Sequence, residues 1–225
     1  MSVVETRYEA AATLPRPYLA QRRIPAWYGP AKRAIDIGVA ALGLAVTAPV
    51  LLLAMAGIVL VTGDDPIFRQ VRVGRNGRTF TMYKLRSMVR DAHERRHEVR
   101  HLNEADGPVF KVRRDPRLHP LGALLRRTSV DELPNFINVL RGDMAIVGPR
   151  PPLPEEVAHY DERAMRRLTV KPGVTCLWQI AGRCELSFEQ WMVLDNAYID
   201  TWTPLGDFAI IAQTIPAVIR GVGAH

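Results

Sequence analysis

The amino-acid sequence predicts a mainly helical α+β fold, in which a membrane helix with a break in its middle precedes a small cytosolic domain. Three observations carry this prediction. Residues 37–62 contain no charged side chain and are long enough to enter a bilayer. Two alternating segments flank the dipeptide Asn76-Gly77, which is a strong β-hairpin signal. Helical periodicity returns in several later segments between turns rich in proline and glycine.

The composition allows one domain-sized core with an apolar segment besides. The chain has 225 residues, and 48% of them are hydrophobic. Its 30 Lys and Arg face 23 Asp and Glu, and the formal net charge of +7 suits anionic lipid, phosphorylated substrates or nucleic acid. The two cysteines, Cys176 and Cys184, lack zinc-site spacing and are too few for a disulfide framework. We expect both to be reduced thiols in a cytosolic compartment.

We divide the chain into a flexible basic lead-in (1–30), a re-entrant membrane helix (31–62) and a cytosolic domain (63–225). The lead-in holds four prolines and no apolar period, so we expect it to be extended or poorly ordered. Up to Arg33 the chain has six basic and two acidic residues. This basic run ends where the apolar segment begins.

The apolar segment is basic on both flanks, so the positive-inside rule places both of its ends on the cytoplasmic side. Pro49 removes a hydrogen bond near its middle and is expected to bend the helix at Ala48. A segment that enters the bilayer, breaks and returns to the same face satisfies both facts. A kinked single span and a buried core helix are the alternatives, and the run is too long for a signal peptide. Asp36 is expected at the lipid headgroups.

The hairpin is expected to have strands at about 67–73 and 79–85. Because strand side chains repeat every two residues, Lys84 and Arg86 should share one strand face. The alternative is that they are two solvated basic residues at a strand end.

Residues 90–104 are highly charged and predict a solvated helix. His93, His97 and His101 recur every four residues and would share one helical face. The arginines between them count against a bound metal cation.

The chain is organised around the stretch from Arg126 to Pro134, in which two arginines precede the adjacent carboxylates Asp131 and Glu132. Because proline has no N–H, Pro134 fits the first turn of a helix, which puts the pair at a helix N-terminus. The helix dipole there favours anions, so we expect ionised carboxylates with room for a phosphate beside them. Alternatively Asp131 is a plain N-cap, or Ser129 and Glu132 form a capping box, which would place the proline inside the helix at a cost of about 3 kcal/mol.

Arg150 stands between prolines in the segment Gly148-Pro-Arg-Pro-Pro152. Proline fixes the backbone on either side, so the guanidinium is held in one direction, which suits a phosphate. The alternative is a proline-rich connector with an incidental arginine.

The remaining elements are expected from periodicity and turn signals. Residues 171–183 predict a turn-bounded loop rich in binding-type side chains. The apolar end from 205 to 225 is expected either to lie on a membrane face as an amphipathic helix or to pack against the core. Helices are predicted at about 121–127, 135–140, 154–168 and 188–202.

Seven short motifs, taken in order, resemble the monotopic phosphoglycosyl transferases. The resemblance is to the catalytic part of bacterial enzymes that move a hexose 1-phosphate onto undecaprenyl phosphate to begin exopolysaccharide or O-antigen synthesis. It runs from about Lys32 to the C-terminus; one motif alone is weak, but seven in order are highly specific. The motifs are Lys32-Arg-Ala-Ile-Asp36, Lys84-Leu-Arg-Ser-Met88, Asp115-Pro-Arg117, Thr128-Ser-Val-Asp-Glu-Leu-Pro134, Gly148-Pro-Arg-Pro151, Lys171-Pro-Gly173 and Leu177-Trp-Gln179.

The resemblance implies specific site residues. It implies that Asp131 is the nucleophile, that Glu132 assists it, and that Mg²⁺ is required. Both carboxylates are candidate metal ligands, and Glu132 either binds the metal or only orients Asp131. It makes the apolar segment a re-entrant helix in the cytoplasmic leaflet, with Asp36, Ala48 and Pro49 as its membrane residues. The positions that it assigns to substrate binding are Lys84, Arg86, Asp115, Arg117, Arg126 and Arg150.

The resemblance also implies a location and partners. It places the protein as a monotopic enzyme on the cytoplasmic face of the bacterial inner membrane, acting on a UDP-sugar and undecaprenyl phosphate. A homodimer is expected and nucleic acid is not, since no aromatic and basic stripe for stacking bases is present. Two features depart from the family: Cys176 stands where glycine is usual, which puts the backbone of that loop in doubt, and the bundle of spanning helices of longer members is absent.

The implied chemistry needs these residue types. Mg²⁺ and arginines relieve the repulsion between a carboxylate and a pyrophosphate and stabilise charge on the leaving UMP. An ionised Asp131 needs no general base to attack the sugar-bearing phosphorus, and the lipid phosphate then resolves the acyl phosphate. Two other functions remain open from the residues: a membrane-anchored Mg²⁺-dependent phosphohydrolase of nucleotide sugars, and a non-enzymatic basic module that docks on membranes. The sequence does not identify the sugar.

Overall fold

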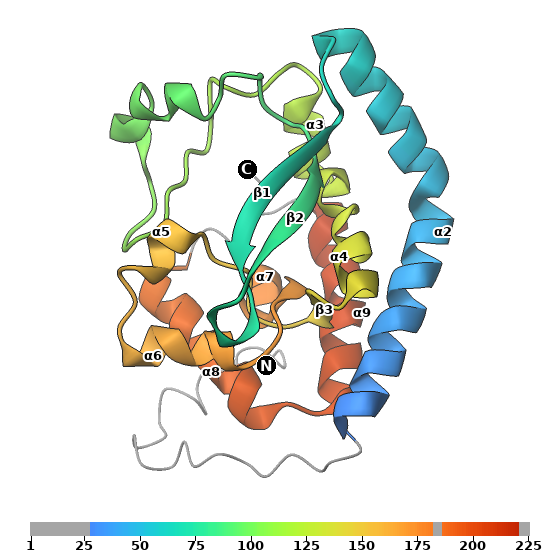
Figure 1. Cartoon of the computed structure of the whole chain (residues 1–225), viewed down its shortest axis with the longest axis vertical. Coiled ribbons are helices and arrows are strands. Elements are labelled where there is room, and N and C mark those ends of the chain that lie inside the picture. Colours follow the sequence, from blue (N-terminus) through green and yellow to red (C-terminus); the bar gives the residue numbers. More distant parts are fainter. Residues whose placement is uncertain (1–27, 182–185, 221–225) are drawn as a thin grey trace.

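The computed structural model describes residues 28–181 and 186–220 and confirms a mainly helical α+β fold. Figure 1 shows the long helix α2 (Tyr28–Thr62) along one side of the molecule, with a β-hairpin near the middle of the view and the C-terminal helix α9 (Pro204–Arg220) between the hairpin and α2. The lead-in predicted over 1–30 lies outside the described residues, except for its last three, which are already helical.

Helix α2 is 35 residues long and is unbroken at Ala48 and Pro49. The predicted break is therefore not seen in the helix. A proline removes one backbone hydrogen bond, and a helix can continue through that defect when the neighbouring turns keep theirs. The helix ends at Gly63, whose φ of +70° is the left-handed conformation that glycine adopts without steric cost.

One face of α2 packs against the rest of the molecule, and the other is apolar and exposed. Ala40 and Ile58 are fully buried, and a Cβ on Gly43 would lie 2.8 Å from the ring of Phe136. On the outer face, Leu60 is 86% exposed. A buried core helix is thereby excluded, and α2 is long and apolar enough to cross a membrane. This outer surface indicates membrane association.

The predicted hairpin is confirmed. Strands β1 (Ile67–Val73) and β2 (Thr79–Leu85) pair antiparallel along their whole length. The turn η2 (Arg75–Gly77) contains Asn76 with φ +59° and Gly77 with φ +76°. Asparagine and glycine tolerate this conformation best, so the turn residues fix the register.

The solvated helix predicted over 90–104 is wrong. The segment forms two short 3₁₀ turns, η3 (Glu94–His97) and η4 (Arg100–Leu102). Ala92 and Val99 are buried, so the chain is held against the core at two points.

The chain then forms three short helical elements in succession. They are α3 (Gly122–Arg127), η5 (Val130–Glu132) and α4 (Asn135–Arg141). The helices α3 and α4 confirm the predicted pair. Helix α4 ends at Gly142, which has φ +90°.

A parallel pair of strands was missed in the sequence. Strands β3 (Ala145–Val147) and β4 (Gly173–Thr175) lie side by side. A Cβ on Gly148 would come within 2.5 Å of the Lys171 carbonyl, and one on Gly173 would collide with the Gly148 backbone. This close approach requires glycine at both positions.

The C-terminal part differs from prediction in two places. The helix predicted over 154–168 is divided into three short elements, and the loop predicted over 171–183 contains β4 and a helix, α7. The helix predicted over 188–202 is confirmed, and the apolar end is helical. The elements are α5 (Pro154–Val157), α6 (Glu162–Met165), η6 (Arg166–Thr169), α7 (Leu177–Ala181), α8 (Phe188–Thr201) and α9 (Pro204–Arg220).

The main hydrophobic core lies between β3, α4 and the C-terminal helices. Its most deeply buried members include Val139, Met144, Leu177, Leu194 and Ile210. A smaller core joins the end of α2 to the hairpin and α3, through Ile58, Leu85 and Leu125.

Candidate active site

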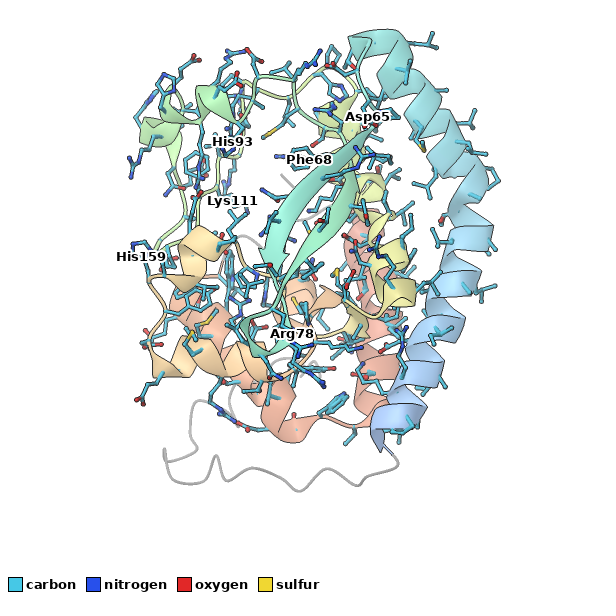
Figure 2. The ribbon with its side chains drawn as sticks, viewed as in Figure 1. Asp65, Phe68, Arg78, His93, Lys111 and His159 are labelled. Atoms are coloured by element: carbon cyan, nitrogen blue, oxygen red, sulfur yellow. The ribbon has the colours of Figure 1, made fainter. Side chains whose placement is uncertain are left out.

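A cavity of about 430 Å³ lies between the hairpin and the arm formed by residues 90–112. Figure 2 shows Phe68 on the strand side of this region and His93 and Lys111 on the arm side, and all three line the cavity. Ala48 and Pro49, which were predicted as membrane residues, are not part of the lining. All eight predicted catalytic and substrate-binding residues are: Lys84, Arg86, Asp115, Arg117, Arg126, Asp131, Glu132 and Arg150.

The adjacent carboxylates lie on η5, directly before α4. Pro134, with φ −61°, stands at the start of α4, so the pair is close to a helix N-terminus as predicted. Neither capping alternative is correct. In the described chain, no side chain of Ser129, Asp131 or Glu132 caps η5 or α4.

Glu132 is engaged with two cations. Its Oε1 lies 2.6 Å from Lys84 Nζ and 3.2 Å from Arg150 Nη1. Burial by itself raises the pKa of this carboxyl, but Lys84 and Arg150 together hold the pKa of Glu132 far below its usual range. Burial in turn lowers the pKa of Lys84, against the attraction of Glu132. Glu132 is therefore anionic and already partnered.

Asp131 is in the opposite situation. It is only 6% exposed, and none of residues 28–181 and 186–220 donates a hydrogen bond to its side chain. Burial raises the pKa of Asp131 to about 6, although Lys84 and Arg126 lower it. The helix dipole was expected to favour ionisation, whereas desolvation dominates in the structure. At neutral pH the carboxylate is still largely ionised, and it is free to bind or attack a ligand.

The predicted rigidity of Arg150 is confirmed. Backbone carbonyls on both sides of Arg150 accept hydrogen bonds from the protein, so this segment has a fixed backbone and is not an incidental connector. The carbonyls of residues 149–152 accept, in order, from Gly173 N (2.9 Å), Arg167 Nη2 (3.1 Å), Arg72 Nη1 (2.9 Å) and Val73 N (3.0 Å).

Two further arginines line the cavity, and each donates a hydrogen bond to a different part of the protein. Arg126 Nε donates to Ser87 Oγ at 3.0 Å, and burial lowers its pKa while Asp131 raises it. Arg86 Nε donates to the Asp65 carbonyl at 2.7 Å. Arg86 and Lys84 share the cavity, as the strand-face argument predicted.

Asp115 and Arg117 line the cavity but are bound to each other. Two guanidinium nitrogens of Arg117 donate to the Asp115 carboxylate at 2.8 and 2.6 Å, and a third donates to the Ala92 carbonyl at 2.8 Å. Burial raises the pKa of Asp115, but the bonds from Arg117 lower it overall. The pair fastens the arm to the cavity wall, and its predicted contact with substrate stays a prediction.

The predicted position of Asp36 at the headgroups is wrong. Its side chain is buried in the protein, where it accepts a hydrogen bond from Ile146 N at 3.0 Å and lies 3.5 Å from Lys32 Nζ. Lys32 also lies 2.7 Å from Asp207 of α9. The Asp36 carboxylate is therefore partnered by Ile146 N and Lys32 of the protein, and not by lipid headgroups.

Three lining residues were not among the predicted site residues: Arg167, Trp191 and Trp178, the last of which stood only in a family motif. Arg167 lies 2.7 Å from Asp195 and donates to the Tyr160 hydroxyl at 2.8 Å, besides holding Arg150. Trp178, which lines the cavity, stacks on Trp191 with ring centroids 4.4 Å apart. These contacts join segments distant in sequence, so no local spacing signals them.

Cys176 is accommodated without a left-handed backbone. It is not among the non-glycine residues with positive φ in the described chain. Its thiol donates to Gln179 Oε1 at 3.3 Å, and burial raises its pKa well above the usual value. The second cysteine, Cys184, lies outside the described residues.

The carboxylate pair fits a magnesium ion better than any histidine cluster does. Mg²⁺ is commonly bound by one or two carboxylates together with substrate phosphates. Asp131 is desolvated and lacks a protein partner, so a cation would relieve the penalty on its charge. Nowhere in residues 28–181 and 186–220, this site included, do three His, Cys, Asp or Glu side chains gather as a metal site, so the pair would need substrate phosphates to complete the coordination.

Comparison with known proteins finds one family. A family model described as "Bacterial sugar transferase" matches residues 27–221. The chain is 44% identical over 195 residues to "Galactosyl transferase CpsE" of Streptococcus agalactiae, covering 86% of this chain and 43% of that relative. It is 36% identical over 201 residues to "Exopolysaccharide production protein ExoY" of Rhizobium meliloti, covering 88% and 89%.

A third relative carries a more specific name. The chain is 38% identical over 205 residues to "UDP-glucose:undecaprenyl-phosphate glucose-1-phosphate transferase" of Caulobacter vibrioides, covering 86% of this chain and 72% of the relative. The chain thus spans less than half of CpsE and most of ExoY.

Proposed function

Since the chain belongs to the bacterial sugar transferase family, we propose that it transfers a sugar 1-phosphate from a UDP-sugar to undecaprenyl phosphate, releasing UMP and beginning exopolysaccharide assembly. The observation that carries this proposal is the unpartnered Asp131 carboxylate in a cavity lined by Lys84, Arg126 and Arg150. The enzyme family sets aside a merely membrane-docking role.

Asp131 acts as the nucleophile in this proposal. Its carboxylate oxygen attacks the phosphorus that bears the sugar, and the bond from this phosphorus to the bridging diphosphate oxygen breaks. UMP leaves with the bonding electron pair. An oxygen of undecaprenyl phosphate then attacks the aspartyl phosphate, forms the lipid diphosphate sugar and frees the carboxylate. No proton transfer is required, because both attacking groups are anionic.

Glu132 supports the site without attacking. Because its Oε1 contacts both Lys84 and Arg150, it keeps these cations charged and directed into the cavity. Lys84, Arg126 and Arg150 then attract the diphosphate and stabilise the charge that gathers on UMP. Arg86 adds a further cation to the lining.

Asp131 and the free oxygen of Glu132 are the residues that would hold Mg²⁺. A bound magnesium ion supplies charge neutralisation on the diphosphate oxygens. Asp115 and Arg117, which are bound to each other, are proposed to fix the cavity wall beside that diphosphate.

We propose a monotopic location on the cytoplasmic face of the inner membrane. The protein domain contacts α2 near both ends, through Asp36 at the start and Ile58 at the finish. At 1.5 Å per residue, 35 helical residues measure about 52 Å, against a hydrocarbon core of roughly 30 Å. A spanning helix could not keep both ends beside one cytosolic domain, which supports a re-entrant or leaflet-bound path. A homodimer stays a prediction.

The test is nucleotide release by the purified protein in detergent with Mg²⁺, UDP-glucose or UDP-galactose, and undecaprenyl phosphate. We expect UMP to appear catalytically with the wild type, and Asp131→Asn to lower the rate at least about 1,000-fold, because the amide is no nucleophile. Release of UDP would mean transfer of a bare sugar and would refute the mechanism. Catalytic UMP release without the lipid would identify a phosphohydrolase instead.

A further inference from the structure

Ser129, two residues before the nucleophile, has an unusual backbone. Its φ of +55° and ψ of +17° are left-handed, a conformation that is unfavourable for residues other than glycine. Among the described residues, only one other non-glycine residue has a positive φ, Asn76 in the hairpin turn. Asparagine is a residue type that tolerates this conformation, whereas serine is less suited to it.

Ser129 ends helix α3 where glycine would be expected. Its N–H donates to the Arg126 carbonyl at 3.0 Å, a bond typical of a left-handed helix C-terminus. Two other helices of this chain end in the same conformation, α2 at Gly63 and α4 at Gly142, and both use glycine. For ending a helix alone, glycine would serve better than serine.

The Ser129 hydroxyl has no protein partner. The residue is half-buried and lines the cavity, and within the described chain its Oγ makes no hydrogen bond. Its carbonyl accepts from Glu132 N at 3.2 Å, which ties it to the carboxylate pair. A hydroxyl donor in a cavity lined by lysine and arginine suits the oxygen of an anion, above all a phosphate.

We propose that Ser129 is a substrate-binding residue whose hydroxyl donates a hydrogen bond to a phosphoryl oxygen. The unfavourable backbone is retained because serine brings this donor to the cavity. The inference rests on the proposed function and deepens it. The phosphoryl group belongs either to the UDP-sugar, in the first step, or to undecaprenyl phosphate, in the second.

The experiment compares Ser129→Gly with the wild type in both steps. A single-turnover burst of UMP without lipid reports the first step, and steady-state UMP release with undecaprenyl phosphate reports both. We expect Ser129→Gly to melt at a higher temperature, because glycine removes the backbone penalty, and yet to react roughly 10-fold or more slowly, since a hydrogen bond to a charged group is lost. A slower burst assigns the hydroxyl to the nucleotide sugar. A normal burst with slow turnover assigns it to the lipid phosphate.

Two further variants separate the hydroxyl from the backbone. Ser129→Ala removes the hydroxyl but keeps a Cβ, and should lose activity as Ser129→Gly does. Asn76→Gly makes the matched backbone change outside the cavity lining, and should leave activity unchanged. Full activity in either Ser129 variant would overturn the proposal. If the wild type itself released no UMP with either sugar nucleotide, the proposed function would fail instead.

Discussion

The two adjacent carboxylates are distinguished by their surroundings and not by their chemistry. Glu132 faces Lys84 and Arg150, which hold its pKa low, whereas burial raises the pKa of Asp131 to about 6. A carboxylate bound to two cations is a poor nucleophile, and an unpartnered desolvated one is a better nucleophile. This contrast supports the roles proposed for the two residues, Asp131 as the nucleophile and Glu132 as its support.

Breaking the Lys84–Glu132 pair should strongly destabilise the protein. The side chains are 14% and 20% exposed, so Lys84→Met leaves a buried anion short of a partner, at a cost of roughly 3 kcal/mol. Thermal unfolding should show this loss, and the double variant with Glu132→Gln should recover part of it. Arg69→Met is the control, because its 2.6 Å pair with Asp65 is about half exposed and should contribute under about 1 kcal/mol. Equal losses in both variants would contradict the prediction.

Most of the site could be found from the sequence because its residues fall in motifs. All eight predicted residues line one cavity. The contacts of Arg167 and the conformation of Ser129 could not be found in this way. Arg167 meets its partners only through tertiary folding, and a left-handed serine has no signature in composition or spacing.

At the scale of elements, the β3–β4 contact is the least tolerant part of the fold. Gly173→Ala would drive a Cβ into the Gly148 backbone, which cannot move without breaking the parallel pair. We expect a loss of about 3 kcal/mol or more, or failure to fold. Gly38→Ala, at an open position within α2, should be neutral or stabilising by up to about 1 kcal/mol. Comparing the melting temperatures of the two variants is the test, and a stable Gly173→Ala protein would refute it.

The ion pair between α8 and η6 should give a measurable pH dependence of stability. Burial raises the pKa of Asp195 to about 6 from its usual 3.8, against the attraction of Arg167. The folded state therefore holds this proton more tightly than the unfolded state. The contribution of Asp195 to the free energy of unfolding is fully present below pH 3.8. It is lost as pH rises to about 6, by up to about 3 kcal/mol.

The measurement for this prediction is the difference in unfolding free energy between wild type and Asp195→Asn across pH 4 to 7. The difference should fall as pH rises and level off above about pH 6. A difference that rises with pH would mean that the ion pair with Arg167 outweighs desolvation.

Elements that depend on local sequence signals were predicted well, whereas elements that depend on contacts between distant segments were missed. The hairpin was predicted to the residue because the Asn-Gly turn and strand alternation are both local. Strands β3 and β4 have three residues each, too few for a period, and they pair across a long separation. The helix predicted over 90–104 failed because burial of Ala92 and Val99, which is a tertiary effect, overrode helical spacing.

At the scale of the whole molecule, both ends of α2 should face the cytoplasm. In a background in which the two native cysteines are replaced by other residues, Gly29→Cys and Asp65→Cys should both react with a membrane-impermeant thiol reagent in inverted vesicles. Neither should react in spheroplasts, where only the outer side is accessible. Reaction of the two positions from opposite sides would demonstrate a spanning helix.

The small core of Ile58, Leu85 and Leu125 also fixes where catalysis takes place. Leu85 lies between Lys84 and Arg86 in sequence, and Leu125 precedes Arg126, so the lipid-facing helix and the basic cavity wall form one rigid unit. With the proposed location and function, the site is held at a constant height above the bilayer, and the lipid acceptor arrives by lateral diffusion in two dimensions. We therefore expect the reaction rate to follow the mole fraction of undecaprenyl phosphate in the lipid or detergent phase, and to be insensitive to its bulk concentration.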